Sequence, residues 1–165
     1  SLLRNKKCTS EIKDFVKGTI FHRILDDGAF NKENNLIKLK KNDKIEKVVL
    51  CSGKIYFDLI NAREEAKNDK IVFIRLEQIY PFPAKTLAQM IKKYKNAEFF
   101  WCQEEPKNMG AWFSVRDYIQ WTLDTIKANN NKISYIGRSP DATPATGYAK
   151  RHNSQQQEII KKVFE

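Results

Sequence analysis

Short apolar runs alternate with segments of helical periodicity along most of this chain, and this alternation constrains the fold more than any other feature. The four runs are Val48–Cys51, Ile71–Ile74, Phe99–Cys102 and Ile133–Ile136. Apart from Ser134, each run is continuously apolar, as expected of a strand that helices cover on both faces. Strands and helices that alternate at this spacing form βαβ units with right-handed crossovers. The predicted fold class is therefore α/β, a three-layer α/β/α sandwich with a mostly parallel sheet.

Apolar side chains at helical spacing predict a helix after each of the first three strands. The residues that mark these helices are Ile55, Leu59, Ile60 and Ala66, then Leu87, Ile91 and Tyr94, and then Trp112, Val115, Ile119, Leu123 and Ile126. Ser52 is the expected N-cap of the first helix, and Pro83 suits the first turn of the second. Trp121, on the third, is expected to pack in the core. Ser154 and Gln157 form a capping-box pattern that predicts the start of a last helix.

The chain before the first strand is weakly patterned. Phe21–Leu25 is the candidate for a short edge strand, and Asp26-Asp27-Gly28 is typical of a turn. A length of 165 residues fits one domain, which we divide into a leading segment, 1–45, and an α/β body, 46–165. Because the sequence opens at Ser1 without an initiator Met, we expect it to be a piece of a longer polypeptide.

The basic residues are numerous but scattered. The formal net charge is +10, and such a balance can indicate a nucleic-acid partner. Here the aromatic residues occupy core-like positions, so the basic-plus-aromatic pattern of a single-strand binder is missing. A lysine-rich solvated surface is the favoured interpretation. The sequence contains neither a signal-peptide pattern nor an apolar run of membrane-spanning length.

The cysteines and histidines restrict the chemistry further. Cys8, Cys51 and Cys102 make an odd count of three, and the last two lie inside apolar runs. This pattern favours reduced thiols in a reducing compartment. The only histidines are His22 and His152. A structural zinc site and a Cys-His nucleophile pair are both disfavoured, because each needs a larger set of partners.

Ligands of open α/β sheets bind beyond the carboxyl ends of the strands. Four loops are expected there, Ser52 to Lys54, Arg75 to Pro83, Gln103 to Gly110 and Arg138 to Gly147. The first loop offers backbone N–H groups at a helix start and an ammonium group, which suit a phosphate or a carboxylate. It lacks the spacing of a Walker motif. The alternative interpretation is a capped helix with an exposed lysine.

Acidic side chains in these loops are candidates for acid–base chemistry or for holding the loops. Glu104 and Glu105 could act as a general acid or base, but pairing with Arg75 or Arg138 is the favoured interpretation. Arg75 and Glu77 alternate at a strand end and share a face, so we expect a buried network there. The residues to which we assign a structural loop role are Arg75, Glu77, Glu104, Glu105 and Gly110. No catalytic residue is predicted.

Five ordered motifs resemble those of the thiamine-dependent 2-oxoglutarate dehydrogenases. They are SLLR at 1–4, CSGKIYFDL at 51–59, RLEQIYPFP at 75–83, WCQEEPKN at 101–108 with Gly110-Ala111-Trp112, and a closing motif of Gly137-Arg138, Ala142, Pro144-Ala145, Gly147, His152 and Gln155-Gln156-Gln157. One departure is Met109, where the family usually has Gln. Together the motifs cover nearly the whole chain.

The resemblance implies a parent enzyme of the tricarboxylic acid cycle that decarboxylates 2-oxoglutarate on thiamine diphosphate with Mg²⁺. That enzyme passes the succinyl group to a lipoyl arm of the dihydrolipoyl succinyltransferase component. The chain itself resembles the transketolase-type C-terminal domain, so the fragment alone should bind neither cofactor nor metal. Its implied partners are the upstream domains and a second copy of the enzyme, and its implied location is the bacterial cytoplasm or the mitochondrial matrix.

Some relatives bind a nucleotide or acetyl-CoA effector beside this domain. These relatives and the position of the loops at the strand ends together predict an anion-binding set of four residues: Ser52, Lys54, Gln103 and Arg138. Two other hypotheses stay open from the residues: a stand-alone nucleotide-binding α/β domain, and a basic nucleic-acid-binding module.

Overall fold

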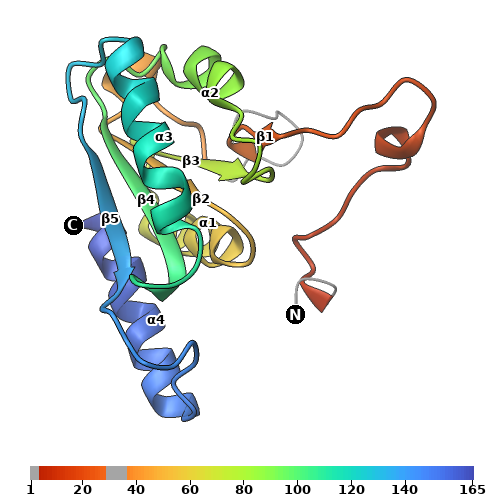
Figure 1. Ribbon diagram of the computed structural model, residues 1–165. Helices are drawn as coiled ribbons and strands as arrows, with labels where there is room; N and C mark the ends of the chain where they lie inside the picture. Colours follow the sequence, from red (N-terminus) through yellow and green to blue (C-terminus); the bar gives the residue numbers. More distant parts are fainter. Residues whose placement is uncertain (1–3, 29–36) are drawn as a thin grey trace.

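The computed structural model describes residues 4–28 and 37–165. Their strands form one five-stranded sheet in the order β1-β3-β2-β4-β5 (Figure 1). The strand bounds are Ile24–Leu25 for β1, Lys47–Cys51 for β2, Ile71–Leu76 for β3, Glu98–Pro106 for β4 and Ile133–Arg138 for β5. The pairs β2–β3, β2–β4 and β4–β5 are parallel, and β1 joins the edge of β3 antiparallel. The mostly parallel sheet is confirmed.

The described α-helices lie on the two faces of this sheet. Their bounds are Ile55–Ala66 for α1, Ala84–Ile91 for α2, Trp112–Thr125 for α3 and Ala149–Phe164 for α4, with the short 3₁₀ helices η2 at Ile12–Phe15 and η4 at Asn42–Lys44. Strand side chains alternate between two cores: Val48 and Leu50 face α2 and α3, and Val49 and Cys51 face α1 and α4. This alternation explains the continuously apolar strands and confirms the three layers.

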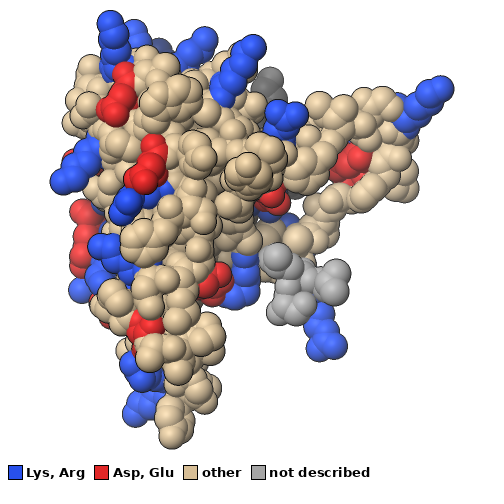
Figure 2. Space-filling model, in the orientation of Figure 1, with Lys and Arg blue, Asp and Glu red and all other residues tan. Residues whose placement is uncertain are grey.

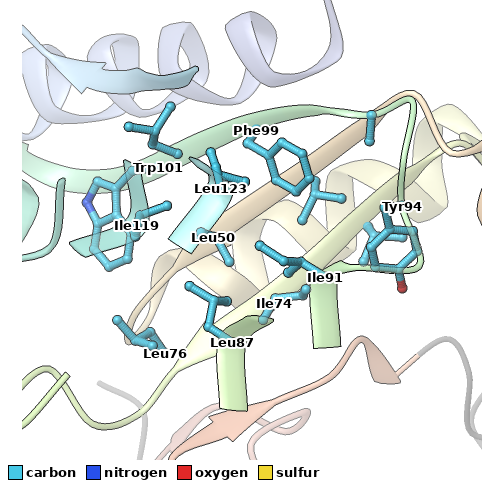
Figure 3. Packing of buried hydrophobic residues seen from close by; sticks show 14 of the residues in the cluster. Leu50, Ile74, Leu76, Leu87, Ile91, Tyr94, Phe99, Trp101, Ile119 and Leu123 are labelled. Carbon is cyan, nitrogen blue, oxygen red and sulfur yellow. The ribbon is translucent and has the colours of Figure 1, made fainter. Parts of the chain in front are cut away.

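The larger core lies between the sheet and the pair α2 and α3. Figure 3 shows Leu50 and Ile74 of the strands packed beside the helix residues Leu87, Ile91, Ile119 and Leu123. The predicted inner face of α2 is confirmed for Leu87 and Ile91, which are fully buried; Tyr94 is also fully buried but lies beyond the end of that helix.

Three local predictions were wrong. Ser52 is not the N-cap of α1: Lys54 occupies that position without a side-chain cap, because Gly53 (φ 75°) turns the chain between Ser52 and the helix. The helix α4 already begins at Ala149, so Ser154 lies inside it. Trp121 is 59% exposed, because it lies about 200° around α3 from the buried Ile119.

The turn at Asp26-Asp27-Gly28 contains a buried ion pair that the sequence did not predict. Both terminal nitrogens of Arg63 in α1 donate to the Asp27 carboxylate, Nη2 to Oδ1 over 2.9 Å and Nη1 to Oδ2. The Phe73 backbone N–H of β3 donates to the same carboxylate over 2.7 Å. The two side chains are 0% and 3% exposed. This pair fixes the leading segment to the sheet and to α1.

The predicted edge strand within Phe21–Leu25 is present, but only Ile24 and Leu25 form it. The SLLR motif at 1–4 lies outside the described residues except for Arg4. Within the described ranges, no helix is both long and apolar enough to cross a membrane.

Candidate functional site

The carboxyl edge of the sheet carries an ion-pair cluster around Lys54. The Lys54 ammonium donates to Asp58 Oδ2 at 2.7 Å and to Glu104 Oε1 at 2.9 Å. Burial disfavours the charge, but the hydrogen bonds to Asp58 and Glu104 outweigh it and raise the pKa of Lys54. Glu104, which lies within β4, pairs with Lys54 rather than with Arg75 or Arg138.

Asp58 connects this cluster to α4 and β5. Gln156 Nε2 donates to Asp58 Oδ2 over 2.9 Å. The Arg138 guanidinium donates to Gln156 Oε1 over 3.4 Å and contacts His152 Nδ1 at 3.0 Å. Because a guanidinium only donates, His152 Nδ1 must be the acceptor, with the ring proton on Nε2. We call this set, Lys54, Asp58, Glu104, Arg138, His152 and Gln156, the edge network.

Gln103 was predicted in a loop but lies in β4, and its buried amide bonds to groups between Trp101 and Trp112. Its Oε1 accepts from the indole of Trp101 at 2.9 Å and from the Trp112 backbone at 3.0 Å. Its Nε2 donates to three backbone carbonyls, those of Glu105, Pro106 and Met109. The amide therefore joins β4 to the start of α3 and offers no further group to a ligand.

Gly110 lies in the turn between β4 and α3. Its φ is 67°, and a Cβ at this position would lie 2.9 Å from Gln103 Nε2. Only glycine combines this backbone conformation with the close approach. The structural role predicted for Gly110 thus has a specific cause.

The structure brings together only part of the predicted anion-binding set. Lys54 and Arg138 are linked through the edge network, Ser52 lies half-buried beside Lys54, and Gln103 bonds within its own segment. Arg75 and Glu77, which were expected to form a buried network, lie 3.6 Å apart as an ion pair between Nε and Oε1. The pair is not buried as expected, since the side chains are 24% and 32% exposed.

A small pocket lies beside the edge network, between the loop after β5 and α4. It has a volume of about 130 Å³. Two polar atoms in its lining residues, Arg138 Nε and Gln155 Oε1, are buried without a hydrogen-bond partner among the described residues. Arg151 and Lys162 at its rim pair with Asp141 at 3.5 Å and with Glu158 at 2.6 Å. The pocket has the polarity to hold a small charged group.

Comparison with known proteins now assigns the family. A family model described as the 2-oxoglutarate dehydrogenase C-terminal region matches residues 9–164. The chain belongs to the 2-oxoglutarate dehydrogenase family. The 2-oxoglutarate dehydrogenase E1 components of Brucella anthropi and Brucella ovis are each 46% identical to it over 156 residues, which is 94% of this chain. The chain spans only 16% and 15% of the length of these relatives.

The fold is also found in a solved structure, a split-gene transketolase described as an inactive beta4 tetramer. Its TM-score is 0.51 at 10% identity, over 78% of this chain and 40% of that one. At this identity the likeness concerns the fold alone, and it agrees with the predicted transketolase C-terminal type. The family assignment favours neither a stand-alone nucleotide-binding domain nor a basic nucleic-acid-binding module. Figure 2 shows basic side chains spread over the visible face among acidic ones rather than gathered in one patch.

Thiamine diphosphate with Mg²⁺ is the cofactor that the family implies, and the described residues do not fit it. Across residues 4–28 and 37–165, no group of three or more His, Cys, Asp or Glu side chains could hold a metal ion. The carboxylates of Asp58 and Glu104 are already paired with Lys54. No step of the family's reaction is therefore assigned to this chain.

The buried thiols are poorly suited to nucleophilic chemistry. Cys51 and Cys102 are partners on neighbouring strands, and both are fully buried. Burial raises the pKa of Cys102 to about 12, with a smaller contribution from the Glu104 charge. Burial also raises the pKa of Cys51 well above its ordinary value. Both side chains therefore remain protonated at neutral pH.

Sequence reasoning assigned no site role to Asp58, His152 or Gln156, each of which was noted only as part of a motif. Asp58 follows Lys54 by four positions, a spacing at which opposite charges on a helix pair. His152 and Gln156 have the same spacing on α4. These local signals were available, whereas the link between α1 and α4 joins residues 98 positions apart.

Proposed function

We propose that this chain serves as the C-terminal domain of a thiamine diphosphate-dependent 2-oxoglutarate dehydrogenase. The parent enzyme would decarboxylate 2-oxoglutarate and transfer the succinyl group to the lipoyl arm of dihydrolipoyl succinyltransferase. The observation that carries the proposal is the 46% identity over 94% of this chain to relatives named as that enzyme's E1 component. Within the parent, this domain would support the upstream domains and the homodimer without supplying a reacting group.

The chemistry of the edge network supports a holding role. Its cation, Lys54, joins α1 to β4 through Glu104, and Asp58 joins α1 to α4 through Gln156. Charge-assisted hydrogen bonds of this kind orient loops strongly. A domain held this way at its carboxyl edge gives upstream domains a fixed surface to contact.

Regulation by an anionic effector is the second part of the proposal. The groups available for it are the ammonium of Lys54, the guanidinium of Arg138 and the half-buried Ser52. An anion at Lys54 would have to compete with Asp58 and Glu104, which lie within 2.9 Å of its Nζ. We therefore expect weak binding of AMP or acetyl-CoA to the chain alone.

The compartment proposed for the parent is the bacterial cytoplasm or the mitochondrial matrix. The thiols of Cys8, Cys51 and Cys102 are unpaired, which agrees with a reducing environment.

The test begins with the full-length reading frame that contains this sequence. The purified full-length protein should release carbon dioxide from 2-oxoglutarate when thiamine diphosphate and Mg²⁺ are added, with pyruvate as the control substrate. The 165-residue chain should release none under the same conditions. A folded full-length protein that is inactive with 2-oxoglutarate would refute the proposed parent activity, and turnover by the chain alone would refute the supporting role.

Effector binding is tested separately by amide NMR of the chain titrated with AMP and with acetyl-CoA. Shifts should centre on Ser52, Lys54 and Arg138 and should be lost in Lys54→Met. The exposed lysine Lys92, just after α2, provides the matched control Lys92→Met, which should leave the shifts in place. Unchanged spectra at millimolar ligand, or equal loss in both variants, would contradict an anion site at this edge.

A further inference from the structure

The segment 4–23, which we call the arm, projects from the body of the domain (Figure 1). It carries five large apolar side chains that are mostly exposed: Ile12 at 86%, Phe15 at 76%, Val16 at 52%, Ile20 at 76% and Phe21 at 67%. Single exposed apolar residues are ordinary on protein surfaces. A cluster of this size within ten residues is characteristic of a surface that contacts another protein surface.

The arm is attached to the body near both of its ends. Near its start, Lys7 Nζ lies 2.6 Å from Glu64 Oε2 in α1. At its end, the Arg23 carbonyl accepts from the backbone N–H groups of Glu77 and Gln78 at 2.9 and 3.0 Å. The buried Asp27 lies four residues further along the chain. The arm is therefore a loop of the domain with a fixed origin, rather than a loose end.

The projecting part also has local structure of its own. The 3₁₀ helix η2 begins after a capping box in which the Asp14 carboxylate accepts from the Glu11 backbone N–H at 2.9 Å. Within η2, Ile12 and Phe15 have the three-residue spacing that places side chains on one side of a 3₁₀ turn. The arm contains one glycine and no proline, unlike flexible linkers, which are rich in glycine and serine. Its low glycine content is therefore more typical of a segment that packs against another surface than of a flexible linker.

We infer that the arm binds the upstream part of the same parent polypeptide, through an apolar groove with an acidic rim. The inference rests on the proposed function. The matching family model describes a C-terminal region, and this chain spans 16% of the relative from Brucella anthropi, so most of that relative precedes the matched region. In Figure 1 the arm, which begins at the first described residue, Arg4, lies away from α4.

Two observations favour the upstream part over a second copy as the occupant. The arm is the segment that leads directly from the upstream part into this domain, so the effective concentration of the upstream surface is high. The arm also carries six basic residues and two acidic ones, and a second copy of this basic chain would bring more positive charge to it. An acidic rim on the partner groove complements this charge.

Hydrogen exchange of the full-length protein and of the 165-residue chain tests the inference. Backbone amides of residues 9–21 should exchange at least tenfold more slowly in the full-length protein. Phe15→Asp should restore fast exchange there in the full-length protein, whereas the conservative Phe15→Leu should not. Neither substitution should shift the melting temperature of the chain alone by more than about 1 °C, since surface changes usually have small effects.

Equal exchange of residues 9–21 in both proteins would overturn the inference. So would a dimer of the isolated chain in sedimentation that Phe15→Asp converts to monomer, because a second copy would then cover the arm. Decarboxylation of 2-oxoglutarate is measured on the same full-length sample. If the full-length protein released no carbon dioxide, the proposed function would be refuted, but the exchange rates would still show whether the arm is covered.

Discussion

The buried pair Asp27–Arg63 should contribute a large share of the stability of this domain, and Asp27→Asn tests it. The substitution keeps the size of the side chain but leaves the Arg63 guanidinium, 3% exposed, without a counter-charge. Two unit charges about 4 Å apart interact by about 4 kcal/mol at an effective dielectric constant near 20. Removing one partner of a buried pair costs about 3–5 kcal/mol in measured cases. We therefore expect a loss of about 4 kcal/mol.

The adjacent residue provides the matched control. Asp26 pairs with Lys93 at 2.9 Å, but these side chains are 37% and 32% exposed. Solvent screens such a pair, so Asp26→Asn should cost less than about 1 kcal/mol. The two substitutions change neighbouring residues of the same type, and their difference measures the effect of burial.

Urea unfolding followed by tryptophan fluorescence gives the magnitude. With a slope near 2 kcal/mol/M, Asp27→Asn should lower the midpoint by about 2 M at unchanged slope. The melting temperature should fall by about 8–16 °C for a domain of this size. A double-mutant cycle with Arg63→Met should give a coupling energy of at least about 2 kcal/mol. A loss for Asp27→Asn no larger than that for Asp26→Asn, or strictly additive single effects, would refute the reasoning.

Three further predictions concern the thiols, the buried Gln103 amide and the carboxyl edge of the sheet. In the native chain at pH 8, DTNB should titrate Cys8, which is exposed, and leave Cys51 and Cys102 unreacted until urea unfolds the chain. Because burial raises the pKa of Cys102 from 9.0 to about 12, its contribution to stability should be complete below about pH 9 and decline as the pH rises toward 12. Gln103→Ala should cost about 3 kcal/mol or more, because it leaves several buried polar groups unpaired; Gln89→Ala, at an exposed position, should cost less than about 0.5 kcal/mol. Glu104→Gln should increase the affinity of the chain for AMP several-fold in an NMR titration, because it removes a negative charge 2.9 Å from Lys54 Nζ.

Each of these three predictions has a defined outcome that would contradict it. Rapid reaction of more than one thiol in the folded chain would show that the buried cysteines are accessible. Similar stability losses for the two glutamine substitutions would show that the Gln103 amide is not required. Unchanged or weaker binding of AMP by Glu104→Gln would show that Glu104 does not compete with an anion at Lys54.

The sheet was predictable from the sequence because its strands are apolar on both faces. The residues of a run such as Val48–Cys51 are enough by themselves to predict a buried strand. The parallel pairing of the strands follows from the helices between them. The edge strand β1 was placed within Phe21–Leu25 but is shorter, since only Ile24 and Leu25 pair with β3.

The candidate site was predictable in location but not in contacts. Loop positions at the strand ends identified Lys54 and Arg138, yet no local pattern indicates that Gln103 turns inward or that Glu104 pairs with Lys54. The buried pair joins residues 36 positions apart, so Asp27 looked like an ordinary turn residue. Contacts of this kind depend on which loops the completed sheet brings together.

Complementation between two fragments tests the central claim most directly. The upstream part of the full-length reading frame and this 165-residue chain would be produced separately, and carbon dioxide release from 2-oxoglutarate would be measured with thiamine diphosphate and Mg²⁺. The account predicts no release by this chain, little by the upstream part, and restored release when the two are mixed. Release by this chain alone, or full activity of the upstream part without it, would contradict the account.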